Sequence, residues 1–195
     1  MNRRAPACCR ETLWHTAATV HKFSLPDKLR RWLLDDGSLT RRLRTICSEN
    51  FRVKILHQGR AAPMVNEAQR LGIPAQQWVF CREVLLYCDN RAMVYARTVI
   101  PAAALKGRLR RLANLGEKPL GEILFADPHI KRGGLEIAQL QLGELLYEKL
   151  LQAKPCNQPL GEKAIWARRS AFLYHDKRLL VSEIFLPNSE FGYGQ

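Results

Sequence analysis

The stretch WVFCREVLLYCDNRAMVYARTVIP, residues 78–101, decides the fold class of this chain. Aromatic and aliphatic side chains fill residues 78–88 and 92–100, as they do in β-strands, and Asp89-Asn90 between the two runs is a turn sequence. Pro101 closes the second run because proline has no backbone N–H to donate to a sheet. The stretch therefore predicts a β-hairpin.

A second hairpin is predicted near the C-terminus, where the turn sequence His175-Asp176-Lys177 separates two apolar runs, 164–174 and 178–186. Residues 51–56 alternate apolar and basic side chains, as a half-exposed strand does. Strands joined by tight turns are antiparallel, so the class is α+β. Helices are expected at 24–37, from Ser38 onward, at 101–115, 119–125 and 142–154, a long connection or flap at 60–77, and either a strand or a helix at 135–140.

The length of 195 residues suits one domain with a core of its own, and 47% of the residues are hydrophobic, as in globular proteins. Residues 1–23 show little periodicity, so we expect a loosely ordered N-terminal arm followed by a single domain over residues 24–195. No apolar stretch approaches the roughly 20 residues that span a bilayer, and the basic start lacks the apolar core of a signal peptide. These features favour a cytoplasmic protein that is not embedded in a membrane.

The formal net charge of +13 is one mark of proteins that bind nucleic acids or anionic membranes. The basic residues are scattered in pairs, however, and neither a long basic tract nor a row of interleaved aromatic residues is present. Two interpretations remain open: a solvated basic surface, or a field that attracts small anions. We expect no nucleic-acid partner.

The six cysteines form no C-x-x-C pair and no Cys/His cluster at zinc spacing, which argues against a metal site. Cys81 and Cys88 lie within apolar runs, where a reduced cysteine behaves as a small hydrophobic residue. A chain of this length needs no disulfide framework. We therefore expect reduced cysteines and a reducing compartment.

Three charges break the apolar pattern of the strands. Arg82 shares a strand face with large apolar residues, Glu183 shares one with Leu179, Val181 and Phe185, and Arg97 lies between Tyr95 and Val99. Buried charges need partners, so one interpretation is a structural ion pair between Arg82 and Glu183. The other is a closed site for an anionic small molecule, in which the guanidinium binds a carboxylate and Glu183 serves as acid, base or hydrogen-bond partner.

Other motifs exclude several enzyme classes. The chain contains no G-x-G-x-x-G, Walker loop, G-x-S-x-G or H-E-x-x-H sequence, which argues against nucleotide-binding, serine-hydrolase and zinc-protease functions. Its five histidines are widely separated, as expected for packing or surface residues.

Six segments, in order, resemble the chorismate lyases of bacterial ubiquinone synthesis, and the resemblance extends from about residue 25 to residue 187. The segments are residues 32–34 with 38–40 (WLL, SLT), 82–86 (REVLL), 96–101 (ARTVIP), 115–121 with 124–125 (LGEKPLG, LF), 166–170 (WARRS) and 180–187 (LVSEIFLP).

The resemblance implies an antiparallel sheet of about six strands with helices against it, and flaps over a buried site. It implies the conversion of chorismate to 4-hydroxybenzoate and pyruvate without a cofactor, by a monomer, as the first committed step of ubiquinone biosynthesis. The carboxylate-binding arginine of the family falls on Arg82, its active-site glutamate on Glu183 and its backbone carboxylate donor on Leu120. Leu39 stands where some relatives have methionine in the pocket wall, and Arg97 adds positive potential.

Two departures from the family and one alternative function remain. The N-terminal arm and the stretch 142–161 look longer than in the shortest members. Ligand-sensing domains of some bacterial transcription regulators resemble the same fold, so the alternative is a non-catalytic, small-molecule-binding domain. Such regulators carry a DNA-binding unit before the sensor, and about 25 residues are too few for one.

Overall fold

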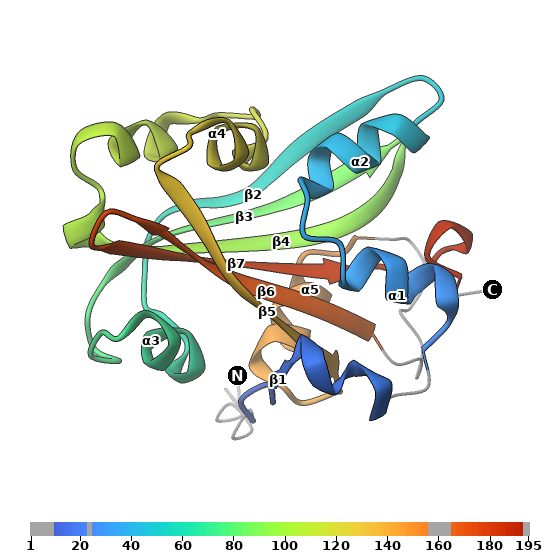
Figure 1. Ribbon diagram of the computed structural model, residues 1–195, viewed down its shortest axis with the longest axis horizontal. Coiled ribbons are helices and arrows are strands. Elements are labelled where there is room, and N and C mark those ends of the chain that lie inside the picture. Colours follow the sequence, from blue (N-terminus) through green and yellow to red (C-terminus); the bar gives the residue numbers. More distant parts are fainter. Residues whose placement is uncertain (1–9, 23–24, 156–164, 193–195) are drawn as a thin grey trace, which may run out of the picture.

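A computed structural model describes residues 10–22, 25–155 and 165–192. One antiparallel sheet of seven strands, in the order β1-β5-β6-β7-β4-β3-β2, organises this part of the chain (Figure 1). The strands are β1 (His15–Thr16), β2 (Phe51–Ala61), β3 (Val79–Cys88), β4 (Arg91–Pro101), β5 (Ile130–Leu140), β6 (Ile165–Tyr174) and β7 (Lys177–Phe185). The α-helices are α1 (Asp27–Leu33), α2 (Leu39–Ile46), α3 (Val65–Leu71), α4 (Leu120–Ala126) and α5 (Leu145–Gln152), and the 3₁₀ helices are η1 (Ala17–Lys22), η2 (Ala102–Ala104), η3 (Gly107–Asn114) and η4 (Ser189–Phe191).

Both predicted hairpins are confirmed. Strands β3 and β4 are joined at Asp89-Asn90, whose φ angles of 49° and 67° are those that a tight hairpin turn requires. Strands β6 and β7 pair from Trp166↔Phe185 to Tyr174↔Lys177, and β7 pairs with β4. The sheet thus places both predicted hairpins side by side. The α+β class is confirmed, with β1 as a strand beyond the six expected.

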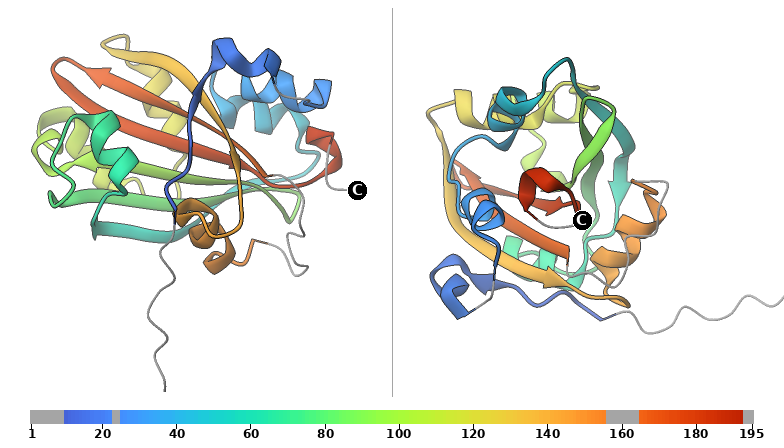
Figure 2. Two further views of the ribbon diagram at one scale, coloured as in Figure 1. Left: turned by 90° about the horizontal axis from the view of Figure 1, so that it is seen from below. Right: turned by 90° about the vertical axis from the view of Figure 1, so that its right-hand side faces the viewer.

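Helices cover both faces of the sheet. Helices α1, α2 and α4 lie on one face, which we call the pocket face, whereas α3 and α5 pack on the opposite face (Figures 1 and 2). Side chains alternate between the faces along each strand, so that Val84 and Leu86 point to the pocket face and Leu85 to the opposite one. Seen end-on, the sheet is strongly curved, with α1 and η4 on its concave side (Figure 2).

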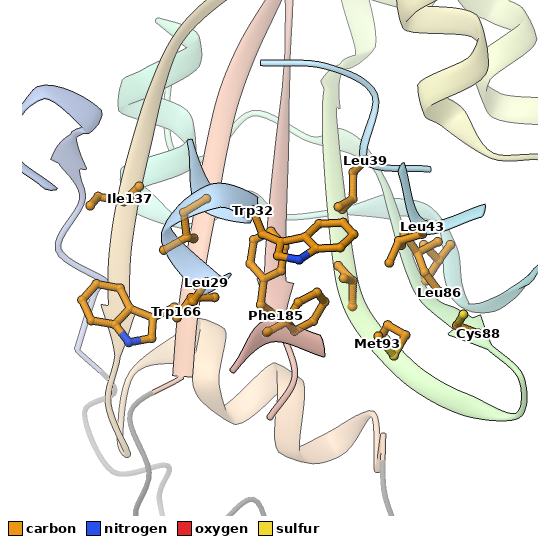
Figure 3. Packing of buried hydrophobic residues seen from close by; sticks show 14 of the residues in the cluster. Leu29, Trp32, Leu39, Leu43, Leu86, Cys88, Met93, Ile137, Trp166 and Phe185 are labelled. Atoms are coloured by element: carbon orange, nitrogen blue, oxygen red, sulfur yellow. The ribbon is translucent and has the colours of Figure 1, made fainter. Parts of the chain in front are cut away.

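The largest part of the core lies on the pocket face, between α1, α2 and the sheet (Figure 3). Trp32 of α1 and Phe185 of β7 meet there, and each packs edge-to-face on Phe191 of η4. Leu29 and Leu43 bring α1 and α2 into the same cluster, and both are fully buried. This packing holds α1 and α2 in place against the sheet.

Several predicted element boundaries need correction. Strand β2 continues to Ala61, and α3 follows within the predicted connection 60–77 because Glu67 caps the backbone N–H of Met64. The predicted helix 101–115 is two 3₁₀ helices, η2 and η3, because Gly107 at the start of η3 has a φ of 57°, which a continuous right-handed helix does not allow. Residues 135–140, for which the sequence allowed either a strand or a helix, belong to β5. The first predicted helix, 24–37, begins at a residue outside the described part of the chain, and α1 itself begins at Asp27, after Pro26.

Residues 10–22, part of the predicted arm, make contacts with the rest of the structure. The backbone N–H of Arg10 donates to Gly143 O at 2.9 Å, the Leu145 N–H donates to Arg10 O at 2.9 Å, and β1 pairs with β5. Unpaired β5 would expose a sheet edge, which β1 covers in part. Residues 1–9 lie outside the described part, and the division of the chain into an arm and one domain stays a prediction.

The expectation that all cysteines are reduced is also corrected, because Cys47 and Cys88 form a disulfide. Cys47 ends α2 and Cys88 ends β3, and the Asp89 carboxylate beside it accepts hydrogen bonds from the N–H groups of residues 48–50. The pairing removes the argument that the cysteines indicate a reducing compartment. Cys81 is free and buried.

Among residues 10–22, 25–155 and 165–192, none of the helices has the length and hydrophobicity that a membrane-spanning helix requires.

Replacing Phe185 by alanine is expected to lower the free energy of unfolding by about 3–5 kcal/mol, because the side chain is fully buried and its removal leaves a cavity. Leu173→Ala, at a side chain 37% exposed, is the control and should change the value by less than about 0.5 kcal/mol. Urea denaturation measures both. A loss below about 1 kcal/mol for Phe185→Ala would contradict the assigned core.

Candidate active site

A pocket lies between the sheet and the helices α2 and α4. Its floor is formed by the pocket-face residues of β3, β4 and β7, and its walls by α2, α4 and Phe172 of β6. Most of the lining is apolar. The lining residues are Leu39, Thr40, Arg82, Val84, Leu86, Ala96, Thr98, Pro119, Leu120, Gly121, Leu124, Phe125, Phe172, Val181 and Glu183.

Arg82 is buried in this apolar lining without a carboxylate partner. Only 3% of the residue is exposed, and its Nη2 donates to the carbonyls of Gly116 (2.9 Å) and Lys118 (3.1 Å) in the loop before α4. Its Nε is buried and has no hydrogen-bond partner in the described part of the chain. Burial lowers the pKa of the guanidinium below its usual value. Such a donor is ready for an anion that enters the pocket.

Glu183 lines the pocket and forms an ion pair with Arg168 of the adjacent strand β6. The two residues are directly opposite in the β6–β7 register, and Arg168 Nε lies 2.6 Å from Glu183 Oε2. The arginine side chain is 1% exposed and the glutamate side chain 16%. The structural ion pair of Arg82 with Glu183, one of the two interpretations of the sequence, is therefore not formed: Glu183 pairs with Arg168, and Arg82 donates to backbone carbonyls.

Arg168 also fixes the chain between α1 and α2. Its Nη1 donates to the carbonyls of Trp32 (2.7 Å) and Asp35 (2.6 Å), which lie at the end of α1 and just beyond it. No role was predicted for Arg168, which is one of the basic residues scattered in pairs along the chain. The signal was present, since Arg168 alternates with Trp166, Ser170 and Phe172 on one strand face, as Arg82 alternates with apolar residues on β3.

Leu39 and Leu120 both line the walls of the pocket. Leu39 is the first residue of α2, after the cap Ser38, whose side chain accepts from the Arg41 N–H. Leu120 is the first residue of α4, so its backbone N–H belongs to the helix start, where N–H groups have no partner within the helix. The two helices meet at Gly121, where an added Cβ would lie 3.2 Å from Ser38 Oγ.

The expectation that Arg97 adds positive potential at the site is wrong, because Arg97 does not line the pocket. It points to the opposite face, where it pairs with Glu67 at 2.7 Å and with Glu83 at 2.5 Å. Burial alone would lower the pKa of the Arg97 guanidinium, but the hydrogen bond and charge of Glu67 raise it above the usual value. Burial also raises the pKa of the neighbouring Cys81 thiol to about 12. The physical reason is period-2 alternation, which turns Arg97 away from its pocket-lining neighbours Ala96 and Thr98.

The arrangement can bind a flat organic acid. Arg82 supplies an unpartnered cationic donor, apolar side chains supply contact surface, and Glu183 supplies a carboxylate oxygen. Within residues 10–22, 25–155 and 165–192, no group of three or more His, Cys, Asp or Glu side chains could hold a metal ion.

Comparison with known families and sequences gives a consistent result. The family described as chorismate lyase matches residues 8–192. A protein from Thiobacillus denitrificans named probable chorismate pyruvate-lyase is 40% identical over 179 residues, which cover 92% of this chain and 93% of that protein. A protein of the same name from Aromatoleum aromaticum is 43% identical over 164 residues, which cover 84% and 86%.

Solved structures share the fold at low sequence identity. A GntR-family transcriptional regulator from Bacillus cereus matches with a TM-score of 0.52 and 13% identity, over 70% of this chain and 92% of that chain. PhnF from Mycobacterium smegmatis matches with a TM-score of 0.52 and 14% identity, over 78% and 65%. Identities this low show a common fold alone, and the sensor alternative gains no further support from them.

Replacing Arg97 by leucine is expected to lower the free energy of unfolding by about 3–5 kcal/mol, because Glu67 would remain buried without its cation and Glu83 would be left with the more distant Lys149, at 3.7 Å. Arg91→Leu, at an exposed position of the same strand, is the control. Denaturant titration of both variants gives the comparison. If Arg97→Leu were as stable as the control, the buried network would not have the energetic role assigned to it.

Proposed function

This chain belongs to the chorismate lyase family, and from that premise we propose that its pocket cleaves chorismate into 4-hydroxybenzoate and pyruvate. The observation that carries the proposal is Arg82, a buried guanidinium whose Nε lacks a partner, in an apolar pocket that also presents Glu183. By family, the reaction belongs to ubiquinone biosynthesis.

Chorismate carries a carboxylate on ring carbon C1, an enolpyruvyl ether on C3 and a hydroxyl on C4. Loss of the C4 hydrogen and cleavage of the C3–O bond make the ring aromatic and release the three-carbon unit. All atoms of chorismate appear in the two products, so no external oxidant, reductant or water is consumed. The enzyme has to position the substrate and stabilise charge. We therefore propose that the reaction needs no cofactor.

Arg82 and Leu120 are proposed to bind the C1 carboxylate. The guanidinium is held in place by the Gly116 and Lys118 carbonyls, which leaves Nε for the ligand. The Leu120 N–H at the start of α4 adds a second donor from the opposite wall. Two donors on one carboxylate fix the ring plane as well as its position. Leu39, from α2, is proposed to contact the ring.

Glu183 is proposed to accept a hydrogen bond from the C4 hydroxyl. Its Oε2 is taken by Arg168, whereas Oε1 has no partner in the described part of the chain. An ionised carboxylate is an acceptor and not a donor, and its partner Arg168 keeps that charge balanced. We propose that the C4 hydrogen passes to the methylene carbon of the departing enolpyruvyl group through a six-membered arrangement. Pyruvate then leaves with its methyl group complete, and Glu183 anchors the ring without transferring a proton.

Location and assembly also belong to the proposal. We place the enzyme in the cytoplasm, because a dicarboxylate such as chorismate does not cross a bilayer unaided. We propose that the protein is a monomer, as the resemblance to the family implies. Chorismate and its two products are the proposed partners, without nucleic acid.

Arg82→Ala is expected to reduce kcat/KM for chorismate by about 100-fold or more, because a carboxylate loses its charged donor in a desolvated site. The assay mixes purified protein with chorismate, without metal or nucleotide, and quantifies 4-hydroxybenzoate and pyruvate by chromatography. Wild type should give equal amounts of both. Arg178→Ala, an exposed position on β7, is the control. Undiminished turnover in Arg82→Ala would sink the anion-binding role.

Glu183→Gln separates anchoring from proton transfer. The single amide oxygen can keep the hydrogen bond from Arg168, and the amide nitrogen can then donate to the oxygen of the C4 hydroxyl, so we expect kcat to fall by less than about tenfold. Loss of a proton-transferring group costs about 100- to 10,000-fold, and a fall of that size would contradict the anchoring role. The measurement is kcat at saturating chorismate, with circular dichroism to confirm that the variant is folded.

A further inference from the structure

The arginines around the pocket differ in whether a carboxylate neutralises them. Arg168 pairs with Glu183, Arg42 pairs with Asp35 at 2.7 Å and Arg44 pairs with Glu122. Among the described residues, Arg82 and Arg132 instead have only neutral oxygen partners. The proposed function uses the first of these two guanidiniums and leaves the second without a role.

Arg132 does not itself line the pocket, but it is held in a defined position near Glu183 and beside the lining residues Phe125 and Phe172. Its Nε donates to Ser170 Oγ at 3.0 Å, and its Nη1 donates to the Asp36 carbonyl at 2.7 Å. Its Nη2 has no hydrogen-bond partner in the described part of the chain, and it is not among the fully buried atoms. The guanidinium thus keeps one free edge.

The local backbone directs this side chain toward the pocket. Arg132 is opposite Phe172 in the β5–β6 register, and a bulge follows between Arg132 and Leu135. Gly133 allows the bulge, because a Cβ there would lie 3.0 Å from the Ala171 carbonyl oxygen. The Arg132 guanidinium carbon lies 5.7 Å from the ring centre of Phe172 and 5.8 Å from that of Phe125, and both rings line the pocket.

Charged residues from several neighbouring segments affect the pKa of Arg132. Burial and the positive charge of Arg168 lower the pKa of its guanidinium, whereas Glu183, Asp36 and Asp35 act in the opposite direction. Asp35 and Glu183 already have arginine partners, and Asp36 is exposed to solvent. An anion bound at the free edge would therefore compensate a partly buried cation that has no carboxylate in direct contact.

Chorismate has two carboxylates, and the second one, on the enolpyruvyl group, is a suitable ligand for Arg132. With the C1 carboxylate on Arg82 and the C4 hydroxyl on Glu183, the C3 substituent lies next to the Glu183 end of the ring. We infer that Arg132 binds the carboxylate of the enolpyruvyl group through its free Nη2, with Phe125 moving aside to admit it. The inference rests on the proposed function and adds a substrate-binding residue to it.

One consequence distinguishes Arg132 from a residue with a structural role. 4-Hydroxybenzoate lacks the second carboxylate, so Arg132 should contribute to substrate binding and not to product binding. A role in holding the loop 35–37 would affect both ligands alike, because that loop precedes the pocket wall at Leu39. The two ligands therefore separate the two roles.

The test compares Arg132→Gln with wild type for two quantities: kcat/KM for chorismate and the Kd of 4-hydroxybenzoate from calorimetry. We expect kcat/KM to fall roughly 10- to 100-fold, as for loss of a charged hydrogen bond, while the Kd changes by less than about threefold. Arg132→Lys, which keeps the charge, should recover part of the loss. A parallel loss for both ligands, or no loss for either, would overturn the inference.

Arg42→Gln is the matched control, because Arg42 holds the same loop through Asp35 and the Arg31 carbonyl. If this variant reproduced the selective loss for chorismate, loop support would explain the effect and Arg132 would not be a binding residue. Circular dichroism and thermal unfolding establish that each variant is folded. If wild type gave no 4-hydroxybenzoate from chorismate, the proposed function itself would fail, an outcome distinct from an equal loss in a working enzyme.

Discussion

The ion pair of Arg168 with Glu183 is the contact on which the pocket depends. The β6–β7 register places the two residues opposite each other, and a guanidinium that is 1% exposed is tolerated only with a partner and satisfied hydrogen bonds. Arg168 meets this condition by also binding the carbonyls of Trp32 and Asp35, so it joins β6, β7 and the end of α1. Arg168 therefore holds both the Glu183 carboxylate at the pocket and the chain that leads to α2.

The two faces of the sheet use buried charge for different purposes. On the opposite face, Arg97 is surrounded by Glu67 and Glu83, and the network is complete without a ligand. On the pocket face, Arg82 and Arg132 have only neutral partners, and each keeps a donor free. A buried cation without its counter-ion costs stability, which the anionic substrate offsets when it binds. We therefore propose that part of the large positive charge of this chain serves the site rather than the surface.

The sequence predicted the hairpins because β-forming runs and turn residues are local signals. It also indicated Arg82 and Glu183, because a charge in an apolar strand face is visible without a structure. Arg97 was misplaced because its face depends on the pairing Glu83↔Arg97, a register that includes a bulge at Leu86/Tyr87. The Cys47–Cys88 disulfide and the role of Arg132 both join residues distant in sequence, for which the chain gives no local pattern.

A crystal structure of the protein with 4-hydroxybenzoate would show directly how the ring is oriented between the two charged groups. We expect the carboxylate on Arg82 Nε and the Leu120 N–H, with the phenolic hydroxyl donating to Glu183 and Arg168 still bound to that glutamate. A ring bound with its hydroxyl at Arg82, or bound outside the pocket between α2 and α4, would contradict this expectation.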